Sequence, residues 1–248
     1  MPIGLLGKKL GMTHAYDPYG RRYAVTAVEA GPCTVLQRRE AKSDGYEALQ
    51  LGFGTVKESK LNKAQAGQFK KAGAGPFRHV REVRTANGEW KVGQQLTVEL
   101  FKEYELVDVS GISVGKGFQG GMKRWHWSGG PETHGSMSHR APGSIGSTTT
   151  PGRVWKGHHL PGHMGSDKVT VQNLRLLKVD LEHNLLLIQG AIPGGENGLV
   201  FITKSKKRPE FIKKPVEITV AIEEDETLSK TAKAASKKLK QPSAGAPK

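Results

Sequence analysis

Six of the chain's nine histidines lie between residues 111 and 165, together with several serines and a single acid, Glu132. Zinc sites use Cys, His and carboxylate ligands at tight, regular spacings on a rigid frame. This cluster would supply almost only histidines on a glycine-rich loop, and a Ser–His nucleophile would lack a GxSxG turn. We therefore expect no metal site and no catalytic residue here, although an RNA-modifying or metal-dependent enzyme stays open as an alternative.

The same segment contains a GxGxxG pattern from Gly115 to Gly120, which in dinucleotide-binding proteins opens a helix. Here glycines and Pro131 interrupt the residues that follow, and the acid expected about twenty residues further on in a second strand is missing. The pattern therefore predicts neither a Rossmann site nor a cofactor.

Glycine, tryptophan and basic residues dominate residues 111–165. The segment holds 14 of the chain's 32 glycines, three of its four tryptophans and six Lys or Arg residues. It has no aliphatic run at helical or strand spacing, so it cannot bury a core of its own. Cations contact phosphates, Trp and His stack on splayed bases, and glycine lets the backbone approach RNA closely. We expect an extension that nucleic acid orders.

The net charge of +15 over 248 residues favours a polyanionic partner, nucleic acid first and an anionic membrane surface second. Residues 111–165 and 226–248 each carry +5, which leaves +5 for the other 170 residues. The single cysteine, Cys33, excludes an intramolecular disulfide and a CxxC zinc site. Because the sequence has no 18-residue apolar window and no signal peptide, it predicts a cytosolic protein.

The elements that must position this segment are mostly strands. Alternating apolar residues and turn signals predict two strands around Asp17–Gly20, a second pair around Ser43–Gly45, and two later strands. These predicted strands cover residues 11–30, 33–40, 46–56, 78–85 and 95–100, and a strand-like stretch at 104–114 leads into the extension. One helix is predicted from Asn62 to Ala72, with Asn62 as its N-cap and Gly73 at its end.

Strand character resumes after residue 165. We expect a hairpin of residues 169–180 and 184–189, buried on both faces, and a last strand at 199–205. The halves on either side of the extension would pair to close one sheet. The predicted organisation is a discontinuous β-barrel body (1–110 with 166–222), an extended RNA-penetrating loop (111–165) and a disordered charged tail (223–248).

The chain also resembles the universal large-subunit ribosomal protein L3 (uL3) family in its bacterial form. The resemblance covers roughly residues 1–208 and is carried by five motifs: GLLGKKLGMT at 4–13, VGKGFQGGMKR at 114–124, GGPETHGS at 129–136, HRAPGSIGSTTTPGRVWKGHHLPGHMG at 139–165 and VTVQNLRLLKVD at 169–180. It implies a mainly β fold, a closed β-barrel of the translation-protein type with a short helical insertion and a long irregular central extension.

For function, the resemblance implies a structural constituent of the large ribosomal subunit with a role in translation. Such proteins bind 23S rRNA directly, nucleate early subunit assembly, and send the extension towards the peptidyl transferase centre. The expected partners are 23S rRNA and neighbouring ribosomal proteins in the cytoplasmic ribosome. Enzymatic activity, cofactor, metal, membrane, small-molecule substrate and homo-oligomer are not expected.

The residues expected to contact rRNA are basic or aromatic. A solvated strand face is the alternative for Lys8 and Lys9, and packing against loop glycines or proline is the alternative for the tryptophans. No modification is expected, because Ser147 replaces the glutamine methylated in some relatives. The expected contacts are Lys8, Lys9, Lys116, Phe118, Lys123, Arg124, Trp125, His126, Trp127, His134, His139, Arg140, Arg153, Trp155, Lys156, His158, His159 and His163.

Overall fold

The computed structural model of the chain describes residues 4–16, 19–84 and 90–208. The predicted turn residues Asp17 and Pro18, Thr85, and the predicted tail 223–248 lie outside the described residues, as does the end of the predicted body. The described part contains twelve strands and few helices, which confirms a mainly β fold. None of the described helices is both long and apolar enough to cross a membrane.

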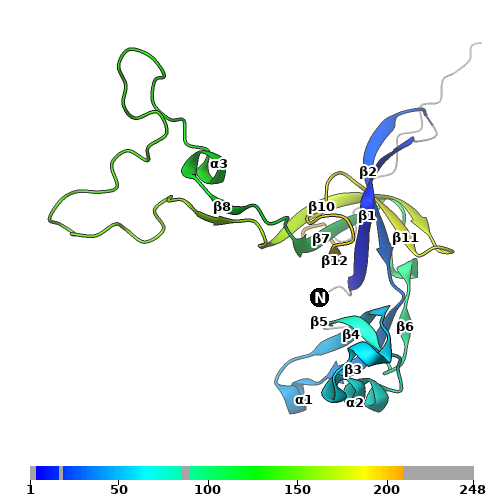
Figure 1. The fold of residues 1–248 in the computed structure, drawn as a ribbon. Coiled ribbons are helices and arrows are strands. Elements are labelled where there is room, and N and C mark those ends of the chain that lie inside the picture. Colours follow the sequence, from blue (N-terminus) through cyan, green and yellow to red (C-terminus); the bar gives the residue numbers. More distant parts are fainter. Residues whose placement is uncertain (1–3, 17–18, 85–89, 209–248) are drawn as a thin grey trace, which may run out of the picture. The chain divides into compact units, whose positions relative to one another are not determined.

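Six strands pair antiparallel in the order β1-β12-β7-β10-β11-β2 (Figure 1). Because β1 also pairs with β2, the strand order returns to its start. Four of the six pairings join a strand before the extension to one after it, as expected for one body interrupted by an insertion. The strands of this ring are β1 (Gly4–Tyr16), β2 (Arg22–Ala30), β7 (Leu106–Ile112), β10 (Lys168–Asp180), β11 (Leu185–Gln189) and β12 (Leu199–Lys204).

Four further strands form a separate sheet in the order β5-β4-β3-β6, where the sequence had suggested a single one. They are β3 (Cys33–Arg39), β4 (Ala48–Thr55), β5 (Phe77–Val83) and β6 (Gln95–Leu96). The strand predicted at 95–100 is therefore too long, because β6 gives way to the 3-10 turn η2 (Val98–Leu100). A 3-10 turn places residues three apart on one side, and here Val98 and Phe101 are both buried.

The predicted helix is confirmed as α2 (Lys63–Ala72), including both of its ends. The Asn62 side chain accepts a hydrogen bond from the Gln65 backbone N–H at 2.8 Å, and the Gln65 side chain accepts one from the Asn62 backbone N–H at 3.4 Å, a capping box. Gly73 ends the helix with φ 63°, in the left-handed region that glycine adopts without steric cost. The shorter elements nearby are α1 (Ala41–Asp44) and the 3-10 turn η1 (Glu58–Lys60).

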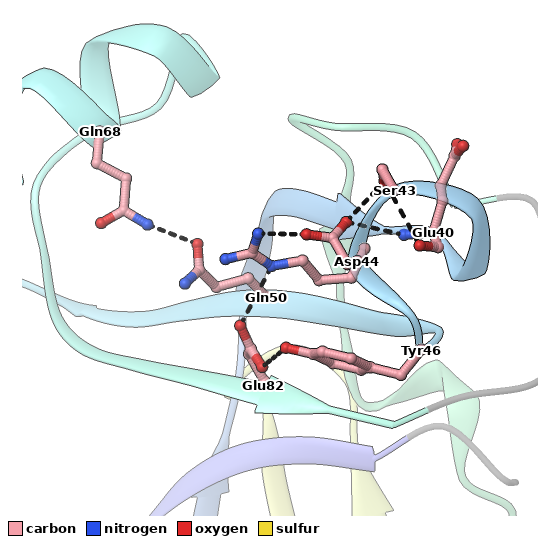
Figure 2. A network of polar contacts seen from close by, with 8 residues as sticks. Glu40, Ser43, Asp44, Tyr46, Gln50, Gln68 and Glu82 are labelled. Atoms are coloured by element: carbon pink, nitrogen blue, oxygen red, sulfur yellow. Dashed lines mark hydrogen bonds and ion pairs between the residues drawn. The ribbon is translucent and has the colours of Figure 1, made fainter.

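Polar contacts tie α1 and the edge strand β5 to β3 (Figure 2). The Arg39 guanidinium lies 2.8 Å from Asp44 and 3.4 Å from Glu82, and the Tyr46 hydroxyl donates to Glu82 at 2.9 Å. The pKa of Asp44 is lowered, first because the Ser43 hydroxyl donates to its carboxylate and further because Arg39 lies beside it. This guanidinium is therefore already occupied by acids of its own sheet.

One cluster of buried apolar side chains draws on both sheets, including Leu5, Val109 and Ile188 from the ring and Leu51 and Val35 from the second sheet. The prediction that the β10–β11 hairpin is buried on both faces is wrong. Successive strand residues point to opposite faces, so only alternate positions reach this cluster. In β11, Leu186 and Ile188 are fully buried while their neighbours Leu185 and Leu187 stay half-buried.

Cys33 is fully buried at the start of β3, and its thiol donates to the Leu6 carbonyl at 3.4 Å. Burial raises the pKa of the Cys33 thiol to about 12, well above the usual value for a cysteine. Because thiolate is the reactive form of cysteine, the fraction of Cys33 present as thiolate near pH 8 should be about a thousandfold lower than in a free cysteine. We expect Ellman's reagent to leave the folded chain unreacted and to titrate one thiol in denaturant. Rapid reaction of the folded chain would show that this core opens.

Candidate nucleic-acid interface

Residues 111–165 leave the ring as a direct continuation of the β7–β10 ladder. Ile112 pairs with Lys168, and the Ser113 backbone N–H donates to the Asp167 carbonyl at 2.9 Å. The Lys116 N–H donates to the Met164 carbonyl, also at 2.9 Å, where the short strands β8 (Gly117–Gln119) and β9 (Gly162–Met164) begin to pair. The base of the extension is therefore a two-stranded ribbon held together by backbone hydrogen bonds.

A single helical turn, α3 (Gly121–Trp125), follows β8 and ends at His126, whose φ of 58° is left-handed. A side chain at position 121 would collide with the Trp127 indole, so this position requires glycine. From residue 126 to residue 161 the chain forms neither helix nor strand, and Figure 1 draws this part as a plain coil. Beyond its regular base, the extension is therefore irregular from residue 126 to residue 161.

Four residues next to α3 connect the two arms of the extension, that is, its outgoing segment up to Trp125 and its returning segment from His159. The Leu160 carbonyl accepts hydrogen bonds from Arg124 Nη1 at 2.7 Å and from Trp125 Nε1 at 2.9 Å. The His159 and Trp125 rings are stacked, with centroids 4.0 Å apart and planes within 4°. The Arg124 guanidinium carbon also lies 5.0 Å from the centre of the Trp125 ring. Three of the expected RNA contacts are therefore brought together by contacts within the chain.

The remaining cations of the extension are exposed and have no ion pair within the described part of the chain: Lys116, Lys123, Arg140, Arg153 and Lys156. Two aromatic side chains are also well exposed, Phe118 at 77% and Trp155 at 63%. Large aromatic side chains are usually buried. Where they are exposed beside cations, the rings can stack on bases while the cations contact phosphates. Trp127, in contrast, is half-buried over Gly121, as the packing alternative anticipated.

The histidines do not converge. His139 shares a hydrogen bond with the Pro131 carbonyl at 2.9 Å, and His159 is engaged with Trp125. Across the described residues no three His, Cys, Asp or Glu side chains are grouped closely enough to hold a metal ion. The other four histidines of the extension have exposed side chains: His126, His134, His158 and His163.

Comparison of the sequence with known proteins identifies its family. The family model described as Ribosomal protein L3 matches residues 71–183. The large ribosomal subunit protein uL3 of Citrifermentans bemidjiense is 53% identical over 208 residues, covering 84% of this chain and 99% of that protein. The chain belongs to the ribosomal protein L3 family. Its bacterial relatives include uL3 of Dehalococcoides mccartyi, 52% identical (82% of this chain, 98% of that protein), and of Brachyspira pilosicoli, 49% identical (83% and 95%).

One expected contact of this L3-family chain must be corrected. Lys9 is 9% exposed, and its ammonium donates to the carbonyls of Ile192 at 3.0 Å and Gly194 at 2.8 Å. An ammonium that binds two backbone oxygens of its own fold is not presented to a phosphate. Lys9 therefore holds the loop before β12 against β1, and only its neighbour Lys8 stays half-exposed.

Sequence reasoning missed a groove on the body that is lined by cations. Lys8 lines this groove of about 690 Å³ together with Arg78 and His79 of β5 and one acid, Glu29. The pKa of His79 is lowered, mainly by burial and further by the nearby positive charges of Arg78 and Arg81. The signal for this groove in the sequence is the segment FRHVREVR at 77–84, which has three arginines and one histidine but a single acid.

Replacing Lys9 with Met keeps the aliphatic stem but removes the donor to two buried carbonyls. Hydrogen bonds from charged groups contribute about 1.5–3 kcal/mol. We therefore expect Lys9→Met to lower the free energy of unfolding by about that amount in urea titrations. Lys8→Met is the matched control and should change stability by less than about 0.5 kcal/mol, the usual range for surface positions. Equal effects of the two substitutions would contradict the structural role of Lys9.

Proposed function

We propose that this chain is a structural constituent of the large ribosomal subunit, binds 23S rRNA directly and nucleates early subunit assembly. The chain belongs to the L3 family. The observation that carries the proposal is that the cations of its extension have no acidic partners among the described residues. Lys and Arg that neutralise phosphates release counterions, which is the main sequence-independent source of affinity for nucleic acid.

The body in this proposal is a closed β-barrel of the translation-protein type, supported by the strand order that returns to its start. We further propose the division into the body (1–110 with 166–222), the extension (111–165) and a separate tail (223–248). Fully extended, an out-and-back loop of this length could reach at most ~90 Å at ~3.3 Å per residue. In this proposal the extension runs from the body towards the peptidyl transferase centre.

Within the extension we assign phosphate contacts to the exposed cations and stacking to Phe118 and Trp155. The exposed histidines would contribute ring stacking or hydrogen-bond donors. On the body, Lys8 with Arg78 and His79 would contact a phosphate that passes the groove. The other partners would be neighbouring large-subunit proteins.

The chain is not an enzyme, because its relatives are uL3 proteins, a structural family of the cytoplasmic ribosome. No small-molecule substrate, membrane or homo-oligomer enters the proposal. The alternative of a metal-dependent or RNA-modifying enzyme receives no support from the positions of the described histidines.

Excision of the tip tests this function. Because Trp125 and His159 are stacked, a short Gly-Ser linker can replace residues 127–157 without moving the body. We expect this variant to unfold at the same urea concentration as the parent chain, since the removed residues are exposed or half-buried. It should associate poorly with large subunits in sedimentation through high-salt sucrose. Parental incorporation and normal translation would contradict the proposal.

Single cation substitutions test the phosphate contacts. Each of Arg140→Ala, Arg153→Ala and Lys156→Ala should weaken binding to a 23S rRNA transcript. Each should also reduce the slope of log affinity against log salt by about 0.7–1, the value for one lost phosphate contact. Arg39→Ala is the matched control, because its guanidinium already pairs with Asp44 and Glu82. If the slope of log affinity against log salt is unchanged in all three extension variants, these residues do not contact RNA phosphates.

A further inference from the structure

The contacts around Leu160 join the two arms of the extension at the end of its ribbon. One arm supplies Arg124 and Trp125 from α3, and the other supplies His159 and the Leu160 carbonyl, 36 residues after Arg124. Two donors on one carbonyl and a parallel ring stack at 4.0 Å make this the densest set of side-chain contacts among the described residues 126–161 and their neighbours in α3. The intervening tip thus starts and ends at one point.

Trp125 differs from the other candidate stacking residues in its contacts. Its indole N–H is used by Leu160, one ring face is covered by His159, and it is 37% exposed. Trp155 is 63% exposed and has no ring partner among the described residues. The two tryptophans therefore offer different surfaces to an RNA, although their sequence surroundings are equally basic.

Glycine at the neighbouring position 162 also fits these contacts. A Cβ atom at Gly162 would lie 2.5 Å from Arg124 Nη1, the atom that donates to Leu160. Gly162 pairs with Gln119 in the ribbon, so the backbone there cannot move away without breaking the β8–β9 pairing. This glycine makes room for a contact within the protein rather than for an approaching RNA backbone.

We propose that Arg124, Trp125 and His159 form a clasp that closes the extension before RNA binds: Arg124 and Trp125 donate to the Leu160 carbonyl, and His159 stacks on Trp125. They are positioning residues: they bring the arms together so that residues 126–158 are presented as one loop. The closure itself is a property of the free chain. Its benefit for binding rests on the proposed function, because a loop with joined ends loses less conformational freedom when RNA orders it.

The free full-length chain tests the closure through its four tryptophan indole N–H signals in NMR. Hydrogen bonding of Trp125 Nε1 to Leu160 should slow its exchange with D₂O roughly tenfold relative to Trp155. His159→Ala should remove this protection, whereas His159→Phe should retain it because the ring stack survives. Lys156→Ala, an exposed neighbour, should leave it unchanged. Equal exchange at Trp125 and Trp155 in the parent chain would overturn the proposal.

Binding to a 23S rRNA transcript separates positioning from direct contact. His159→Ala should weaken binding roughly two- to tenfold, the range expected for one aromatic pair, with an unchanged salt slope. His159→Phe should restore the affinity. Lys156→Ala should instead lower the slope, as a lost phosphate contact does. Failure of His159→Phe to restore binding, or a changed slope in His159→Ala, would make His159 an RNA contact and overturn its positioning role.

The two proposals can fail separately. If the parent chain does not bind the transcript at all, the proposed function is wrong while indole protection still measures the clasp. If the transcript binds but the Trp125 indole is unprotected in the free chain, the clasp is wrong and the proposed function stands. Gly162→Ala gives an independent check of Arg124, because the added Cβ should displace its guanidinium from the Leu160 carbonyl without removing any side chain of the clasp. Protection of the Trp125 indole should then fall, and unchanged protection would exclude Arg124 from the clasp.

Discussion

The antiparallel pairing of β7 with β10 is the interaction on which the arrangement of the extension depends. The chain leaves the ring at Ile112 and returns at Lys168, its direct partner, so both arms start one strand spacing apart, about 4.8 Å. From there the ladder continues into β8 and β9, where the backbone groups stay paired without any aliphatic core. A ring strand that paired elsewhere would separate the arms and leave the extension without a base.

The described cations divide according to what neutralises them. In the body, Arg39 pairs with two acids, Lys204 lies 2.9 Å from the buried Glu105, and Lys9 is capped by backbone carbonyls. In the extension the single acid, Glu132, has no cation beside it among the described residues. Positive charge is thus compensated internally at these body positions and left for an external anion along the extension. Net charge alone does not make this distinction.

Local patterns predicted most of the elements, and they failed where distant contacts decide. The N-cap and C-terminal glycine of α2 are local signals, so that helix was found to the residue. The burial and hydrogen bonding of Lys9 depend on carbonyls more than 180 residues away in the sequence, which no local pattern encodes. The stack of Trp125 on His159 likewise joins two arms that look equally basic and aromatic in sequence. The short η2 turn replaced only the second half of a predicted strand, and it buries Val98 and Phe101.

The pairing of β1 with β12 has a consequence for the order of folding. Gly4 pairs with Thr203, so the ring cannot close until nearly the whole described chain has left the ribosome that makes it. The sheet of β3 to β6 spans only residues 33–96 and can form much earlier during synthesis. The extension is also synthesised before the ring closes. A nascent chain therefore exposes its basic extension while its largest sheet is still incomplete. Cellular RNA can bind the extension before the body has folded.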